Sequence, residues 1–204
     1  MLRVIRTLLA TAAVFIAAVV VRADITAKDA LRTMPDSILE PLTQKVLSDL
    51  TEYYEASQRE KTMENSLGGE AKILTLEASH ALIRTGTART LTFDILTTKS
   101  DTVYAVIETF ETPVKDSRLT IYNKKWEPQL KLWKEPKSKD WLNPYGRKHR
   151  SAFEQDVPYI LAEYSFDRAT GILTLTNRSK ENDYMLAQLR YQWTPKGFKF
   201  IKDD

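Results

Sequence analysis

Cysteine is absent from the 204-residue sequence, and histidine occurs only twice, at His80 and His149. The lack of cysteine excludes a disulfide framework, a lipid-modified cysteine anchor, and thiolate metal or redox chemistry. The sequence also lacks an HExxH zinc motif, a GxSxG elbow, a phosphate-binding glycine loop and a dinucleotide fingerprint. It therefore predicts no cofactor and no metal. Stability must come from an ordinary hydrophobic core.

No apolar run is long enough to span a membrane as a helix. The longest, Leu8 to Val21, has about 14 residues, whereas a spanning helix needs about 20. Arg3 and Arg6 precede this run, and Val21-Arg22-Ala23 after it fits the small-x-small rule for signal peptidase. We therefore expect a signal peptide over residues 1–23, cleaved after Ala23, and a periplasmic or secreted protein that is not integral to the membrane.

An excess of positive charge is missing from the mature chain. Three of the 30 basic residues lie in the expected signal peptide, which leaves 27 against 27 acidic residues. A neutral exported protein gives no reason to expect a nucleic acid as partner.

Three consecutive strands are predicted between residues 87 and 122. The segment 90–95 alternates polar and apolar residues, which is typical of a strand with one buried face. The segment Thr102–Thr112 is apolar on both faces, so it should lie in the interior of the sheet. The segment Ser117–Asn123 alternates again after turn residues at 113–116, and the three together predict an antiparallel meander.

Helices are predicted before this meander and hairpins after it. Thr26 can cap a short helix that ends before Pro35, and a longer helix from about Leu47 should end at Gly68-Gly69. Further strands are expected at 73–78, 159–166, 172–177, 185–193 and 198–201. This order predicts an α+β fold, with N-terminal helices packed on one curled, mainly antiparallel sheet of about eight strands.

One domain is expected over residues 24–204, because no flexible linker divides it. It contains two β-rich halves, 24–125 and 159–204, with an irregular segment between them that is rich in tryptophan, proline and lysine. Several short motifs in the first half resemble an uncharacterised family of secreted Bacteroidales proteins, a domain of unknown function. The motifs are Met34-Pro35-Asp36-Ser37-Ile38-Leu39, Asn65-Ser66-Leu67-Gly68-Gly69, Asp101-Thr102-Val103, Thr112-Pro113, Asp116-Ser117-Arg118, Tyr122 and Trp126. The resemblance implies a Gram-negative envelope location and assigns no functional residue.

The irregular segment contains the best candidate for a binding site. Between Lys124 and Arg150 there are nine basic and three acidic residues, interleaved with aromatic side chains. Lysines attract phosphates or carboxylates over a long range, and tryptophan faces stack on sugars or enter a lipid headgroup region. The alternative is that these aromatic residues fix a long loop onto the sheet. The predicted ligand-binding residues are Trp126, Lys131, Trp133, Lys134, Trp141, Tyr145 and Arg147.

Glu108 is the one carboxylate predicted on an apolar strand face, so it can be a general acid with a raised pKa or the partner of a base such as Arg118. Without a second catalytic group it specifies no mechanism. We therefore expect a non-enzymatic binding module of the envelope for an anionic glycan, a lipid headgroup or a partner protein. The alternatives are an assembly protein that docks another envelope protein and a carboxylate-dependent hydrolase.

Overall fold

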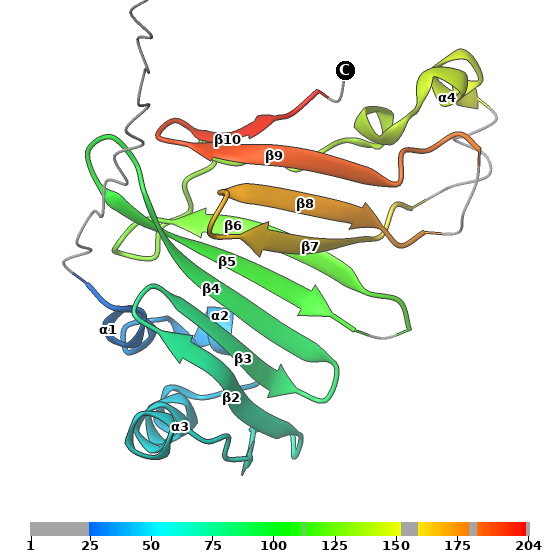
Figure 1. Cartoon of the computed structure of the whole chain (residues 1–204). Helices are drawn as coiled ribbons and strands as arrows, with labels where there is room; N and C mark the ends of the chain where they lie inside the picture. The colour runs from blue at the N-terminus through cyan, green and yellow to red at the C-terminus, as the bar shows by residue number, and fades with distance from the viewer. Residues whose placement is uncertain (1–24, 112, 152–158, 180–182, 203–204) are drawn as a thin grey trace, which may run out of the picture.

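The structure is a computed structural model that describes residues 25–111, 113–151, 159–179 and 183–202 (Figure 1). The predicted signal peptide lies outside these residues. The described elements, in chain order, are α1 (Ala27–Leu31), α2 (Asp36–Leu39), α3 (Gln44–Ser57), β1 (Met63–Glu64), β2 (Glu70–Glu77), β3 (His80–Gly86), β4 (Arg89–Thr97), β5 (Thr102–Phe110), β6 (Asp116–Tyr122), a 3-10 helix (Ser138–Trp141), α4 (Pro144–Lys148), β7 (Ala162–Asp167), β8 (Ile172–Asn177), β9 (Gln188–Thr194) and β10 (Gly197–Phe200).

The strands form two antiparallel sheets, one of six strands in the order β1 to β6 and one of four in the order β10-β9-β8-β7. The α+β class and the β4-β5-β6 meander are confirmed. The expectation of one sheet of about eight strands is wrong. The chain after β6 turns back, and the amide of Gln129 donates to the carbonyl of Ile121 on the β6 edge. The first amides of β7 donate to the side chains of Asp116 and Ser117 rather than to the β6 backbone, so the ladder stops there.

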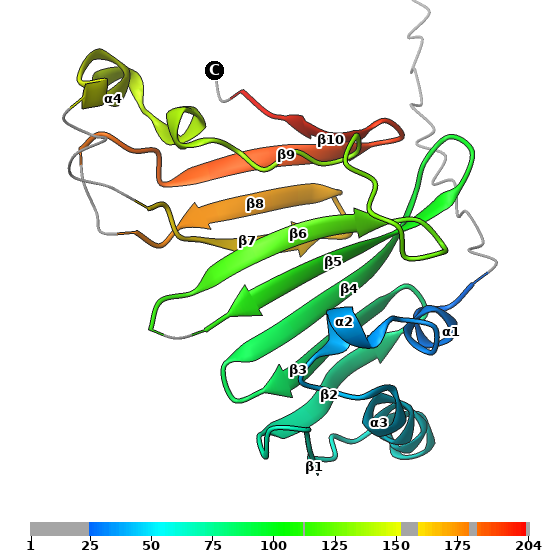
Figure 2. The same ribbon diagram turned by 180° about the vertical axis from the view of Figure 1, so that it is seen from behind.

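Helices α1, α2 and α3 cover one face of the six-stranded sheet (Figure 2). Their apolar side chains pack on alternate residues of β2 to β5, among them Ile83, Phe93 and Tyr104, and this forms the first core. The Thr26 cap is confirmed, because its hydroxyl accepts from the Asp29 amide. Trp126, in the turn after β6, closes this core and donates from Nε1 to the Thr33 hydroxyl at 3.1 Å.

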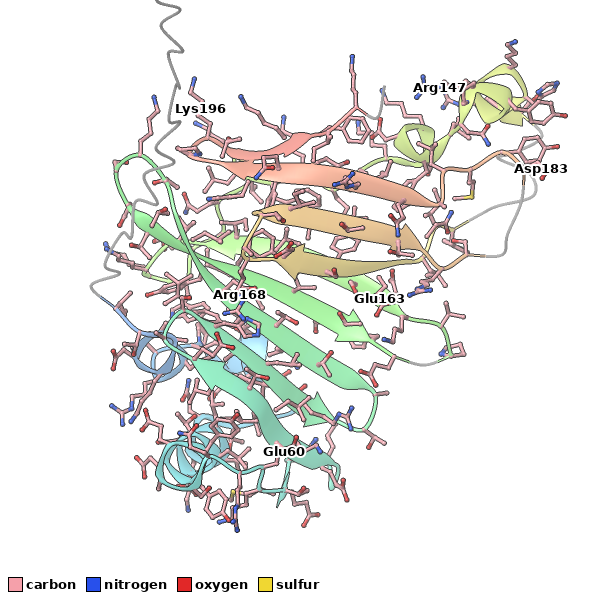
Figure 3. All side chains as sticks on the ribbon, viewed as in Figure 1. Glu60, Arg147, Glu163, Arg168, Asp183 and Lys196 are labelled. Atoms are coloured by element: carbon pink, nitrogen blue, oxygen red, sulfur yellow. The ribbon has the colours of Figure 1, made fainter. Side chains whose placement is uncertain are left out.

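The four-stranded sheet packs on the opposite face of β4 to β6 and forms the second core. Val103, Ala105 and Ile107 of β5 contribute to this core, whereas Tyr104 and Val106 contribute to the first. β5 is therefore covered on both faces, which confirms the prediction of an interior strand. Arg168, in the turn after β7, adds an ion pair across the sheets to Glu77 of β2 at 2.6 Å (Figure 3).

The second predicted helix is shorter than expected. It begins after the Thr43 cap and ends at Ser57, because Gln58 takes a left-handed conformation with φ 53°. Gly68-Gly69 lies instead in the turn between β1 and β2, where Gly68 has φ 77° and the Asn65 side chain accepts from the Gly69 amide. The sequence reading missed β3 and β1. Within the described ranges, no helix is long and apolar enough to cross a membrane.

Candidate functional site

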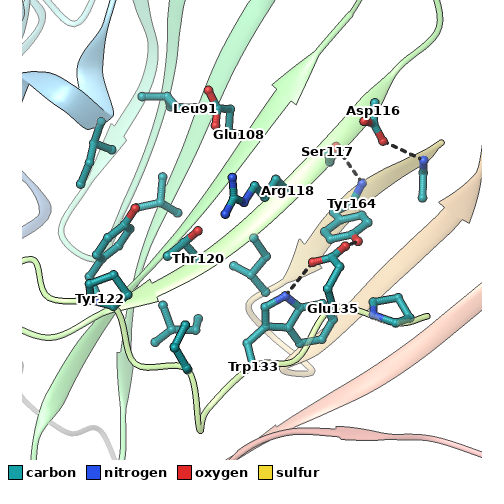
Figure 4. Close-up of a pocket in the computed structure, with 18 of the residues that line it drawn as sticks. Leu91, Glu108, Asp116, Ser117, Arg118, Thr120, Tyr122, Trp133, Glu135 and Tyr164 are labelled. Carbon is teal, nitrogen blue, oxygen red and sulfur yellow. Dashed lines mark hydrogen bonds between the residues drawn. The ribbon is translucent and has the colours of Figure 1, made fainter. Parts of the chain in front are cut away.

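A cleft of about 960 Å³ runs along β6 between the helical side of the large sheet and the chain that returns from it (Figure 4). Residues of β6 from Asp116 to Tyr122 form its base. Leu91, Val106 and Glu108 line one side together with α2, and the other side is formed by the segment 128–141 and by the start of β7. The cleft therefore lies where the two sheets separate and the β6 edge has no neighbouring strand.

Arg118 points into the middle of this cleft, between Glu108 on one side and Glu135 on the other (Figure 4). β6 alternates, so Arg118 faces the cleft while Ser117 and Leu119 point into the sheet packing. The side chain of Arg118 is exposed, and no described carboxylate lies within ion-pair distance of it. Its five N–H donors are consequently available to an acidic ligand.

Glu108 stands opposite Arg118 in the β5–β6 register, yet its carboxylate pairs with another arginine. Arg89 of β4 donates from Nε to Glu108 at 2.5 Å, and its other donors reach the carbonyls of Ile38 and Leu39 at the end of α2. The negative charge of Glu108 is therefore balanced by Arg89, which also holds α2 in place. Glu108 makes its ion pair with Arg89 and not with Arg118, which has no ion-pair partner among the described residues.

Glu135 accepts two hydrogen bonds at the opposite wall. Trp133 donates from Nε1 at 3.1 Å, and the Tyr164 hydroxyl donates to the other carboxylate oxygen. Glu135 is exposed as a residue, but its carboxyl is held against the protein by these bonds, and partial burial there raises its pKa against the smaller opposing effects of the Trp133 hydrogen bond and the Arg118 charge. The cleft thus places a free guanidinium beside an acid that holds its proton to a higher pH than usual.

The structure separates the seven ligand-binding residues that the sequence predicts. Trp126 is buried in the first core, and Trp133 and Trp141 are buried in the second, where both also line the cleft. Their faces pack on protein neighbours; Trp133, for example, meets Tyr191 edge-on at 5.1 Å. They are therefore not an exposed platform for sugar rings.

The basic and tyrosine residues of that prediction lie outside the cleft. Lys131 and Lys134 are exposed on the connecting segment, and neither lines the cleft. Tyr145 and Arg147 lie on α4, at the far end of the four-stranded sheet (Figures 1 and 3). Tyr145 stacks on Tyr184 with a centroid distance of 5.5 Å. Ligand binding by these residues stays a prediction.

The two histidines contact other side chains in the described structure. His80 pairs through Nδ1 with the buried Asp94 at 2.8 Å, and His149 is exposed and packs on Tyr145. Across the part of the chain that the structure describes, no three His, Cys, Asp or Glu side chains are grouped so that they could hold a metal ion.

The fold and the cleft together define an α+β protein of two antiparallel sheets, with a polar site at the edge where the sheets part. The chain belongs to the family described as "Protein of unknown function (DUF3256)", whose model matches residues 19–197. A search among curated proteins finds no match. A solved domain of an uncharacterized protein from Porphyromonas gingivalis W83 has the same fold, with a TM-score of 0.71 and 21% identity over 86% of this chain and 98% of that one.

Sequence reasoning missed Arg118 as a functional candidate. It weighed this residue only as the partner of Glu108, because the two are opposite in a predicted hairpin. The available signal was Arg89, a second base that flanks the same acid from the neighbouring strand.

Proposed function

We propose that this protein is a non-enzymatic binding module of the bacterial cell envelope whose ligand site is the cleft along β6. The observation that carries this proposal is Arg118, an arginine without an ion-pair partner among the described residues, directed into a cleft of about 960 Å³. Cavities of this size are typical of ligand sites, and a free guanidinium selects ligands with a carboxylate or a phosphate. The envelope location rests on the expected signal peptide.

The ligand carries an acidic group and an apolar part. Arg118 and the Tyr164–Glu135 pair offer polar contacts, while Leu119, Ile121 and Trp133 supply apolar wall. Anionic glycans, lipid headgroups and acidic polypeptides share this chemistry. Hydrolysis is the weaker alternative, because two of the three acids that line the cleft already have partners: Glu108 is paired with Arg89, and Asp116 accepts from the Ala162 amide.

A tryptophan fluorescence titration tests the site, because Trp133 lines the cleft and donates to Glu135. The mature protein, residues 24–204, is titrated with an oligosaccharide of uronic acids, with anionic phospholipid vesicles and with acidic peptides, each at low and high salt. We expect saturable binding to at least one of these that weakens with salt.

Arg118→Ala should weaken this binding about tenfold or more, since a charge-assisted hydrogen bond is lost. Lys134→Ala removes the same charge outside the cleft and is the matched control; it should bind as the wild type does. A loss with Lys134→Ala but not with Arg118→Ala would place the site on the basic segment instead. The absence of binding by all three ligand classes would refute the proposal.

A further inference from the structure

The backbone of β6 carries hydrogen-bonding groups that face the cleft and have no partner among the described residues. The carbonyl of Ile121 accepts from Gln129, so it points away from β5. In an antiparallel ladder every second residue points the same way, and the amide and carbonyl of Leu119 therefore also face the cleft. No described residue bonds either group.

The residue that carries these groups is largely buried. Leu119 is only 4% exposed, yet it lines the cleft. Buried backbone groups are almost always hydrogen-bonded, and leaving a donor or an acceptor unpaired costs about 1–3 kcal/mol for each. Leu119 thus offers one amide and one carbonyl to a backbone segment that enters the cleft.

The chain itself pairs with both ends of this edge. At one end Gln129 and Pro128 return along Ile121 and Tyr122. At the other, the start of β7 lies against Asp116 and Ser117, as described above. In the described part of the chain, no residue pairs with the middle of the edge around Leu119, which borders the cleft.

The surroundings of this edge favour a polypeptide over a glycan or a lipid. Leu130 and Tyr159 line the cleft and are 76% and 79% exposed. Large apolar side chains at the border of a cleft are typical of contacts with a protein segment. Neither a glycan nor a lipid headgroup supplies amides and carbonyls at the repeat of a strand.

We propose that the ligand of the cleft is an extended polypeptide segment that pairs with β6 as an added strand and places an acidic side chain opposite Arg118. This inference rests on the proposed function and specifies its ligand. Residues directly opposite in paired strands have Cβ atoms about 5 Å apart, so an Asp or Glu at that position reaches the guanidinium. Backbone pairing supplies affinity and the acidic residue supplies specificity, as in other cases of strand addition.

Synthetic eight-residue peptides of alternating Val and Thr, with Glu, Gln or Lys at one central position, test this proposal on the mature protein. We expect the Glu peptide to bind about tenfold more tightly than the Gln peptide, and Arg118→Ala to remove the difference. On binding, hydrogen exchange of the Leu119 amide should slow about tenfold or more, because that amide gains a partner.

Backbone N-methylation separates strand pairing from simple charge attraction. Successive amides of a strand point to opposite edges, so one Glu peptide is methylated at odd positions and a second at even positions. One of the two should lose binding about tenfold or more and the other should keep it. Equal binding of both, or an unchanged exchange rate at Leu119, would overturn the strand-pairing proposal.

Other outcomes would separate the strand-pairing proposal from the proposed function. Arg118-dependent binding of the oligosaccharide or the vesicles, without methylation-sensitive peptide binding, would leave a binding module whose ligand is not a strand. Binding of neither peptides nor other anions would overturn both proposals.

Discussion

Two buried tyrosines differ in whether the hydroxyl has a partner. Tyr104 is fully buried beside Phe93 and Trp126, and its hydroxyl makes no hydrogen bond with a described residue. Tyr164, also buried, donates to Glu135 at the cleft wall. Burial raises the pKa of Tyr104, so it stays protonated at neutral pH. Its ring stabilises the core, whereas its hydroxyl contributes a desolvation cost.

Tyr104→Phe should leave the free energy of unfolding unchanged or raise it by up to about 1 kcal/mol, because no hydrogen bond is lost. Tyr164→Phe should lower it by about 1–2 kcal/mol, since Glu135 loses a donor. Urea denaturation of the three proteins, with equal m-values, measures both effects. Equal losses in the two variants would show that the Tyr104 hydroxyl has a partner in solution.

Glu135 and Glu163 should change stability with pH in opposite directions. The pKa of Glu135 is raised by burial, so its folded form binds its proton more tightly than the unfolded chain does. Its contribution to stability is complete below the ordinary pKa near 4.5 and is lost as the pH rises through the folded pKa. At Glu163 burial also raises the pKa, but hydrogen bonds from Lys115 and Arg178 outweigh it and lower the pKa, so its contribution is lost as the pH falls.

Urea denaturation between about pH 3 and 8 measures the direction in which each glutamate changes the free energy of unfolding with pH. The stability of the wild type relative to Glu135→Gln should decrease with rising pH, starting near pH 4.5. Relative to Glu163→Gln it should increase over the acidic range. Curves of the same slope for both variants would contradict the assignment of the Glu135 shift to burial.

At the scale of elements, a single arginine holds α2 onto the large sheet. α2 has only four residues and no side-chain cap, so it has little stability of its own. Arg89 of β4 donates to the carbonyls at its end and to Glu108 of β5, and it is mostly buried. The planar guanidinium spreads five donors over three nitrogens in a fixed fork, whereas a lysine ammonium offers three donors from one atom and cannot reach the same spread of acceptors.

Arg89→Lys should therefore lower the free energy of unfolding by about 2–3 kcal/mol, through the lost hydrogen bonds and a poorly paired Glu108. Arg32→Lys is the matched control, since the Arg32–Glu52 contact at 3.9 Å is exposed and such pairs contribute about 0–1 kcal/mol. Chemical denaturation measures both. A loss below about 1 kcal/mol in Arg89→Lys would show that α2 is held mainly by its apolar contacts.

At the scale of the whole molecule, the two sheets share the second core. Six apolar side chains of the large sheet face the small sheet, and the described hydrogen bonds between β6 and β7 add to this packing. The six side chains are those of Leu96, Val103, Ala105, Ile107, Leu119 and Ile121. Removing the small sheet would expose all six to water. The sheets are therefore expected to fold as one cooperative unit.

Unfolding of residues 24–204 should show a single transition in which tryptophan fluorescence and far-UV circular dichroism coincide. A fragment of residues 24–125 should bind the dye ANS and lack a cooperative transition, because its β4–β6 face is uncovered. Two separate transitions, or a stable fragment, would show two domains in place of one.

How far the sequence predicts the fold depends on whether a pattern is local. The apolar segment 102–112 and the segment 172–177 after a glycine-terminated turn predict β5 within two residues and β8 to the residue, because these signals need only neighbours in the chain. The break between β6 and β7 has no local signal. It arises because the returning chain occupies part of the β6 edge, and that contact joins residues far apart in the sequence.

The sequence by itself determined the α+β class, the β4–β6 meander, the C-terminal hairpins and the aromatic character of the connecting segment. Tertiary structure decided where the aromatic side chains point and which charges remain unpaired. Glu108 pairs with Arg89, 29 positions before Arg118, and Arg118 faces the cleft without an ion-pair partner among the described residues. The sequence determines which charged residues each strand carries. Which of them form ion pairs depends on distances between strands, and those distances exist only once the sheet has formed.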